Sequence, residues 1–172
     1  MCYFGAIATL IYGYHLLTKP FDSYLKPAIA ELYHLGKTDE LQKKINYINK
    51  IRWVIITILT LFFIQYNHML LSNYGQDFTL ASGPLTLLAC LSCIQYLGQP
   101  ANEILHYTGN QGALSIIMTI QFVVIAILCK LLIPTYGMWG AVIAQGIPSI
   151  LSVLTSAYIL RRRTQLKLYF LF

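Results

Sequence analysis

Long apolar stretches without charge dominate the chain. Five of them follow one another, each bounded by a charged residue or the start of the sequence, at 1–18, 53–76, 78–102, 104–129 and 131–160. Each stretch holds 18 to 30 residues. A helix of about 20 apolar residues spans the roughly 30 Å of hydrocarbon in a bilayer. The pattern therefore predicts about five transmembrane helices.

The expected spans are 3–33, 51–71, 80–105, 114–132 and 138–160, the first continuing as helix past Lys19 to Tyr33. The alternative is a soluble bundle with a large apolar core. A soluble helix needs a polar face, and the run VIITILTLFFI at 54–64 has none. We predict an all-α membrane protein in which residues 1–172 form a single transmembrane domain.

Composition narrows the functional classes. Hydrophobic residues make up 57% of the chain and charged residues 10%, whereas soluble domains run nearer 25% charged. These values argue against a soluble enzyme and against a disordered chain. The net charge of +6 does not indicate a nucleic-acid partner, because the basic residues are few and cluster at the ends of apolar runs.

The positions of Lys and Arg predict the orientation. Basic residues concentrate in 37–52 and in the basic tail 161–172, and such segments usually stay on the cytoplasmic side. We therefore expect a cytoplasmic C-terminus, with the N-terminus outside and further helices upstream of residue 1. The segment 37–50 carries Leu41, Ile45 and Ile48 at helical spacing, which predicts an amphipathic helix on the cytoplasmic membrane surface.

Charged residues near the end of the first span are the main candidates for chemistry. Lys19, Asp22 and Lys26 are spaced i, i+3 and i+7, so they can pair along one helix face. Ionisable groups at membrane depth usually face a polar cavity and mark a substrate path. The alternative is a cluster at the membrane interface that only ends the span. No metal site or cofactor is expected, since the pair Cys90 and Cys93 has no second pair at zinc spacing.

Glycine and proline predict where the later helices end and approach one another. Gly109 lies in a short polar turn, and Pro134 with Gly137 predicts a tight turn between the last two spans. Gly140 and Ala144 then form a small-xxx-small face that allows close helix packing.

A family resemblance becomes specific in this region. The string LLIPTYGMWGAVIAQGI, followed by a span and the tail RRR, resembles the C-terminal region of polysaccharide flippases, the bacterial exporters of O-antigen and capsule repeat units. They belong to the multidrug/oligosaccharidyl-lipid/polysaccharide exporter superfamily. The passages KPAIAELYHLGKTDEL and 97–112 agree with that resemblance. It covers essentially the whole chain but only the later part of a family member, which implies a partial bundle equivalent to most of the C-terminal half of a two-lobed flippase.

The resemblance implies a multi-pass protein of the bacterial inner membrane that is not an enzyme. It would move an undecaprenyl-pyrophosphate-linked oligosaccharide between leaflets by alternating access. The implied partners are that polyprenyl-pyrophosphate-linked oligosaccharide, the lipid bilayer, a missing N-terminal half and the polysaccharide polymerase machinery. As site residues we expect Lys19 and Lys26 to contact the pyrophosphate, and Tyr12, Tyr14 and His15 to contact sugar rings.

Three alternatives remain open. A cation-coupled multidrug antiporter of the same superfamily would need a buried acidic residue in mid-span, and the sequence suggests none. A membrane-embedded glycan or lipid transferase would need a cluster of acidic or His residues facing the active site, for which we find only Glu103 and His106 as candidates. The third is an inactive, truncated remnant of a transporter.

Overall fold

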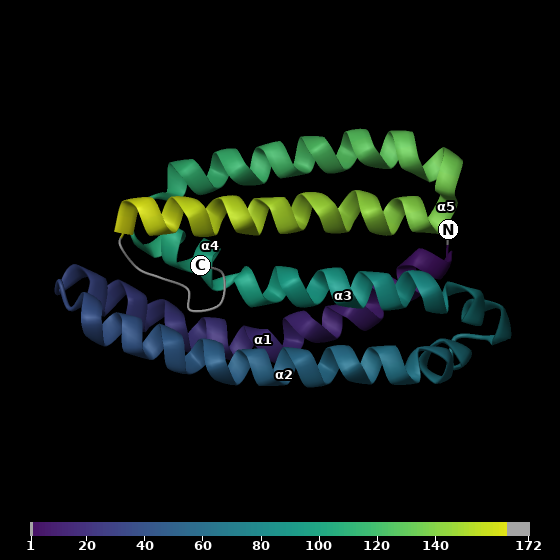
Figure 1. Ribbon diagram of the computed structural model, residues 1–172, viewed down its shortest axis with the longest axis horizontal. Coiled ribbons are helices and arrows are strands. Elements are labelled where there is room, and N and C mark those ends of the chain that lie inside the picture. The colour runs from purple at the N-terminus through teal and green to yellow at the C-terminus, as the bar shows by residue number, and fades with distance from the viewer. Residues whose placement is uncertain (1, 165–172) are drawn as a thin grey trace.

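The fold is a bundle of helices, in a computed structural model that describes residues 2–164 (Figure 1). No strand occurs within that range. The all-α class predicted from the sequence is confirmed. The elements in chain order are α1 (Cys2–His34), α2 (Thr38–Ser72), the 3-10 helix η1 (Gln76–Ala81), α3 (Ser82–Gly98), α4 (Pro100–Tyr107) and α5 (Gln111–Thr164).

Three helical stretches are long and apolar enough to cross a membrane: Thr38–Ser72, Asp77–Tyr107 and Gln111–Thr164. They support a membrane protein. The predicted count of about five spans is not confirmed, because α1 is not among the three and the 54 residues of α5 count once. Residues 165–172 of the predicted basic tail lie outside the described part of the chain.

Helix α5 consists of two arms that fold back on each other (Figure 1). The reversal is at Gly137, where φ is +54° and ψ is −125°. Positive φ costs an L-residue with a Cβ but not glycine, so the predicted turn is correctly placed. The expected role of Pro134 is wrong, since this proline lies inside the helix of the first arm and the chain reverses three residues later.

Small residues allow the second arm to approach its neighbours closely. A methyl group at Gly140 would overlap the main-chain carbonyl of Leu132 on the first arm, and one at Gly146 would overlap the side chain of Leu91 on α3. Ala144 between them is fully buried. The predicted close-packing face at Gly140 and Ala144 is therefore confirmed.

Helices α1 and α2 form a long antiparallel hairpin that turns at Gly36, where φ is +69° (Figure 1). The segment 37–50 is amphipathic as predicted, but the expectation of a separate helix on the membrane surface is wrong. It is the first part of α2, which continues to Ser72. Its apolar residues Leu41, Ile45 and Ile48 are buried against α1 and α4 rather than turned to lipid.

The elements form layers, with α3 and α4 in contact with α1 on one side and α5 on the other. The predicted helix 80–105 is interrupted at Gln99, between Gly98 and Pro100. The turn at Gly109 is confirmed, with φ +77°. The turns at Gly36 and Gly109 and the end of α5 lie at one end of the bundle. The turn at Gly137 and the connection 73–81 lie at the other (Figure 1).

Replacing Gly140 with alanine tests the close approach of the two arms. Gly140→Ala is expected to lower the stability of the chain by about 1–3 kcal/mol, because the added methyl group meets main-chain atoms that cannot rotate away. Thermal unfolding in detergent measures the change. Gly112→Ala on the same helix is the matched control, since nothing lies within 4 Å of its added methyl group. Equal midpoints for the two variants would contradict the packing described.

Candidate functional site

A buried polar layer crosses the bundle between two apolar clusters. One cluster lies toward the Gly137 end and includes Ile7, Tyr14 and Leu85. The other lies toward the Gly36 end and includes Leu25, Ile45 and Ile104. Between the clusters, four of the helices contribute buried polar residues to what we call the polar layer: Thr18 and Asp22 of α1, Asn49 and Arg52 of α2, Ser92 of α3, and Ser149 and Ser152 of α5.

The centre of the polar layer is an ion pair between Asp22 and Arg52. Arg52 Nη1 donates to Asp22 Oδ1 at 2.6 Å, and the two side chains are 1% and 6% exposed. Arg52 Nη2 also donates to Gln99 Oε1 at 3.2 Å. The guanidinium therefore joins α1, α2 and the break between α3 and α4. A planar, delocalised cation suits such a site because one group can serve several acceptors.

A second ion pair lies nearer the surface, with Lys26 Nζ 3.6 Å from Glu103 Oε2. The predicted pairing of Lys19, Asp22 and Lys26 along one face of α1 is wrong, because Asp22 and Lys26 bind partners on other helices. Lys19 is exposed and makes no salt bridge within the described residues. The ion pairs of Asp22 and Lys26 therefore join different helices, whereas the sequence predicted ion pairs within α1.

A polar cavity of about 200 Å³ borders the polar layer. It lies between α1, the α3–α4 break and both arms of α5, and Gln121 of one arm donates to Ser149 Oγ of the other at 3.1 Å. Several of the side chains in the wall of this cavity are amides. Its lining residues are His15, Gln95, Tyr96, Gln99, Asn102, Met118, Gln121, Ser149, Ser152 and Val153.

The predicted sugar-contacting residues divide between the cavity and the core. His15 lines the cavity, and the exposed ring of Tyr12 lies 5.3 Å from the His15 ring. Tyr14 is fully buried. Its hydroxyl is 2.8 Å from Thr60 Oγ1, and its ring stacks on Tyr96 at 5.4 Å. Tyr14 therefore supports the cavity wall from behind, and neither Lys19 nor Lys26 lines the cavity.

Sequence reasoning missed the residues that define this site. The amide residues of the cavity wall lie in uncharged stretches, so a search for charged residues does not find them. They are Gln95, Gln99, Asn102 and Gln121. Their position within predicted spans could have identified them, because a polar group without a hydrogen-bond partner is costly in hydrocarbon. The burial of Asp22 was missed as well.

Three or more His, Cys, Asp or Glu side chains do not come together as a possible metal site anywhere in the described range. Cys90, Cys93 and Cys129 are free thiols. The chemistry available in the cavity is therefore hydrogen bonding by amides, hydroxyls and one imidazole, with charged groups close behind the wall.

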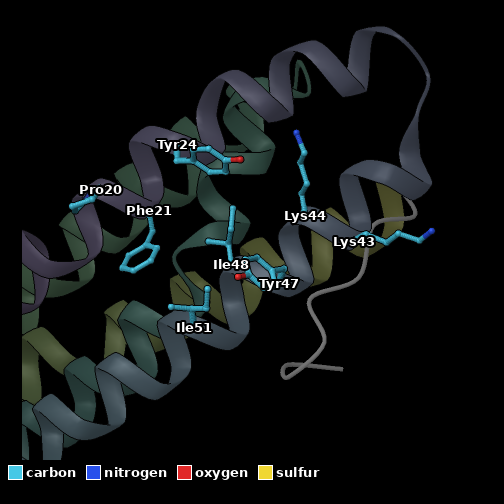
Figure 2. A pocket seen from close by; sticks show the side chains of 8 residues that line it. All are labelled: Pro20, Phe21, Tyr24, Lys43, Lys44, Tyr47, Ile48 and Ile51. Atoms are coloured by element: carbon cyan, nitrogen blue, oxygen red, sulfur yellow. The ribbon is translucent and has the colours of Figure 1, made fainter.

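A second concave region lies on the outside of the hairpin, between α1 and α2 (Figure 2). We call it the interfacial groove. Its volume is about 540 Å³, and Lys44 extends across it toward α1 in Figure 2. Apolar and aromatic residues form most of its wall. The lining residues are Pro20, Phe21 and Tyr24 of α1 and Lys43, Lys44, Tyr47, Ile48 and Ile51 of α2.

Comparison with protein-family models, curated proteins and solved structures finds no match.

Removing one partner of the buried ion pair is expected to be strongly destabilising. Arg52→Met leaves the Asp22 carboxylate buried without its cation, which typically costs about 3–5 kcal/mol. The double variant Asp22→Leu/Arg52→Met is expected to recover most of that loss, since no isolated charge remains. Unfolding by SDS in mixed micelles measures both variants.

The matched control is the exposed pair formed by Lys37 and Glu40, whose charged atoms are 3.6 Å apart. Lys37→Met is expected to cost at most about 1 kcal/mol, as for other solvent-exposed pairs. A loss for Arg52→Met no larger than that for Lys37→Met would show that the buried pair does not hold the helices together.

Proposed function

We propose that the chain is part of a membrane transporter that moves a polyprenyl-pyrophosphate-linked oligosaccharide across the bacterial inner membrane for surface polysaccharide synthesis. The observation that carries the proposal is the polar cavity, which places amides and an imidazole beside the buried polar layer, between two apolar clusters. Sugars and pyrophosphate cannot enter hydrocarbon without losing hydration at great cost. A polar path lined by protein lowers that cost while the polyprenyl tail stays in lipid.

In the proposed topology, α1, α2, the α3–α4 pair and the two arms of α5 are five spans. Each of these rods runs between the two ends of the bundle in Figure 1. The end with the Gly36 turn and the end of α5 carries basic residues, among them Lys43, Lys44 and Arg161 to Arg163. Basic loops are retained in the cytoplasm, so this end and the C-terminus are assigned there.

The proposed substrate contacts follow the cavity. His15 and the amides of Gln95 and Asn102 bind sugar hydroxyls, and Tyr12 stacks beside His15. Lys19 lies one helical turn from His15 and supplies a cation for the pyrophosphate outside the cavity. Lys26 is already paired with Glu103, so its contact with pyrophosphate requires that carboxylate to be displaced.

Alternating access requires a second bundle facing this cavity, in the manner of two-lobed carriers. The first arm of α5 presents large exposed apolar residues, including Phe122 at 73% and Ile116 at 62% exposure. Such a surface suits lipid or an opposing helix. A second bundle of helices and the polysaccharide polymerase machinery are the proposed protein partners.

One observation favours a cation-coupled antiporter as a second candidate function. Asp22 is a buried carboxylate, as coupling sites in such proteins require. The Asp22 carboxylate is, however, engaged by Arg52 at 2.6 Å, and a carboxylate neutralised by a guanidinium is a poor ligand for a coupling cation. The oligosaccharide carrier therefore accounts better for the geometry.

Leucine substitutions in the cavity test the proposed function. In the source cells, where any partner bundle is also made, His15→Leu/Gln95→Leu in place of the native chain is expected to reduce surface glycan export about fivefold or more. Losing one hydrogen bond of about 1 kcal/mol already changes a rate by that factor. Lectin staining of the cell surface measures export, with protein abundance checked in the membrane fraction.

Gln65→Leu is the matched control, because Gln65 is an exposed amide on α2 outside the cavity. Equal export by the cavity variant and this control would contradict the site assignment. Unchanged surface glycan after deletion of the chain would favour the inactive remnant, and loss of drug efflux in its place would favour the antiporter.

A further inference from the structure

We propose that the interfacial groove between α1 and α2 binds an anionic glycerophospholipid, with the head-group phosphate at Lys44 and the upper acyl chains along the apolar wall. This site is separate from the polar cavity and does not depend on which cargo is moved. The two concave regions share no lining residue, and α1 lies between them.

The groove lies at the depth of the lipid head groups. The uncharged stretch of α2 begins at Trp53, and that of α1 ends at Thr18. Pro20, Phe21 and Ile51 lie within three residues of these limits. Lys44 lies nine positions before Trp53, about 13 Å along a helix axis, and a lysine side chain reaches back several ångströms toward the head-group layer.

The lining changes from apolar to basic in the same direction as a phospholipid does. Ile51 and Phe21 are nearest the hydrocarbon, Tyr24 and Tyr47 follow, and the two lysines, Lys43 and Lys44, are farthest out. Tyrosine is typical of membrane interfaces because its ring is apolar and its hydroxyl is polar. The volume of about 540 Å³ suits a head group with its glycerol rather than a whole lipid.

The charges of the groove favour an anion. Lys43 and Lys44 make no salt bridge with any described residue. The nearest acid along the helix is Glu40, which binds Lys37 at 3.6 Å. In Figure 2 the Lys44 side chain extends across the groove toward α1, whereas Lys43 points away. A phosphate at Lys44 would therefore gain a cation that no carboxylate of the described residues occupies.

These features favour a lipid over a protein segment or a second copy of the chain. Basic pockets between transmembrane helices on the cytoplasmic side recognise anionic head groups in this way. An apolar helix packed over the groove would instead leave the ammonium groups of Lys43 and Lys44 without an anion. Only a helix with its own carboxylates would avoid this.

Lipid titration of the purified chain in detergent tests the proposal. Phosphatidylglycerol is expected to raise the thermal unfolding midpoint, while zwitterionic phosphatidylcholine with the same acyl chains has a much smaller effect. Lys44→Ala is expected to weaken the apparent affinity for phosphatidylglycerol about fivefold. The matched control Lys50→Ala removes the same charge from an exposed position of α2 outside the groove and is expected to retain binding.

A second pair of variants fills space without changing charge. Ile51→Trp fills the apolar part of the groove and is expected to reduce phosphatidylglycerol binding, whereas Val54→Trp, at an exposed site beside it, is not. Equal stabilisation by the two lipids, or unchanged binding in Lys44→Ala, would overturn the proposal. So would Ile51→Trp changing the oligomeric state while lipid binding persists, because the groove would then be an interface between copies.

Discussion

The ion pair between Asp22 and Arg52 constrains the rest of the bundle. Burying each charge costs several kcal/mol, which only good geometry and further hydrogen bonds can offset. The contact at 2.6 Å and the bond from Arg52 to Gln99 offset part of that cost, while Arg52 Nε has no hydrogen-bond partner among the described residues. They also fix how far α1 and α2 can slide past one another, because a shift of one turn would leave both charges without partners. Apolar packing alone, among interchangeable Leu and Ile side chains, would permit such a shift.

The hydrogen bond between Arg52 and Gln99 connects the polar layer with the polar cavity. Gln99 accepts from Arg52 and also lines the cavity, and it lies at the junction of α3 and α4. Gly98 and Pro100 flank it, and proline lacks the N–H that would continue the helix. One amide is therefore shared between the ion pair and the cavity wall.

Much of the fold could be predicted from the sequence, because the signals are local. The uncharged stretches predicted where most of the helices lie, and Gly137 predicted where α5 reverses direction. What could not be predicted depends on partners distant in the chain. Asp22 has lysines on both sides along α1, yet it binds Arg52, 30 positions away. The apolar stripe of 37–50 fits a membrane surface as well as it fits a neighbouring helix, and only the position of α1 and α4 decides between them. Of the cavity, His15 was predicted, but the amides from separate helices were not.

The α1–α2 hairpin is longer than the hydrocarbon layer of a bilayer is thick. The two helices have 33 and 35 residues, about 50 Å each, so they outreach a hydrocarbon layer of roughly 30 Å. From the ion pair to the tip at Gly36, α1 extends a further 20 Å or so at 1.5 Å per residue. A 10° swing about the ion pair would move that tip by nearly 4 Å. A partner bound at the tip would therefore be displaced much farther by such a swing than the groups beside the ion pair.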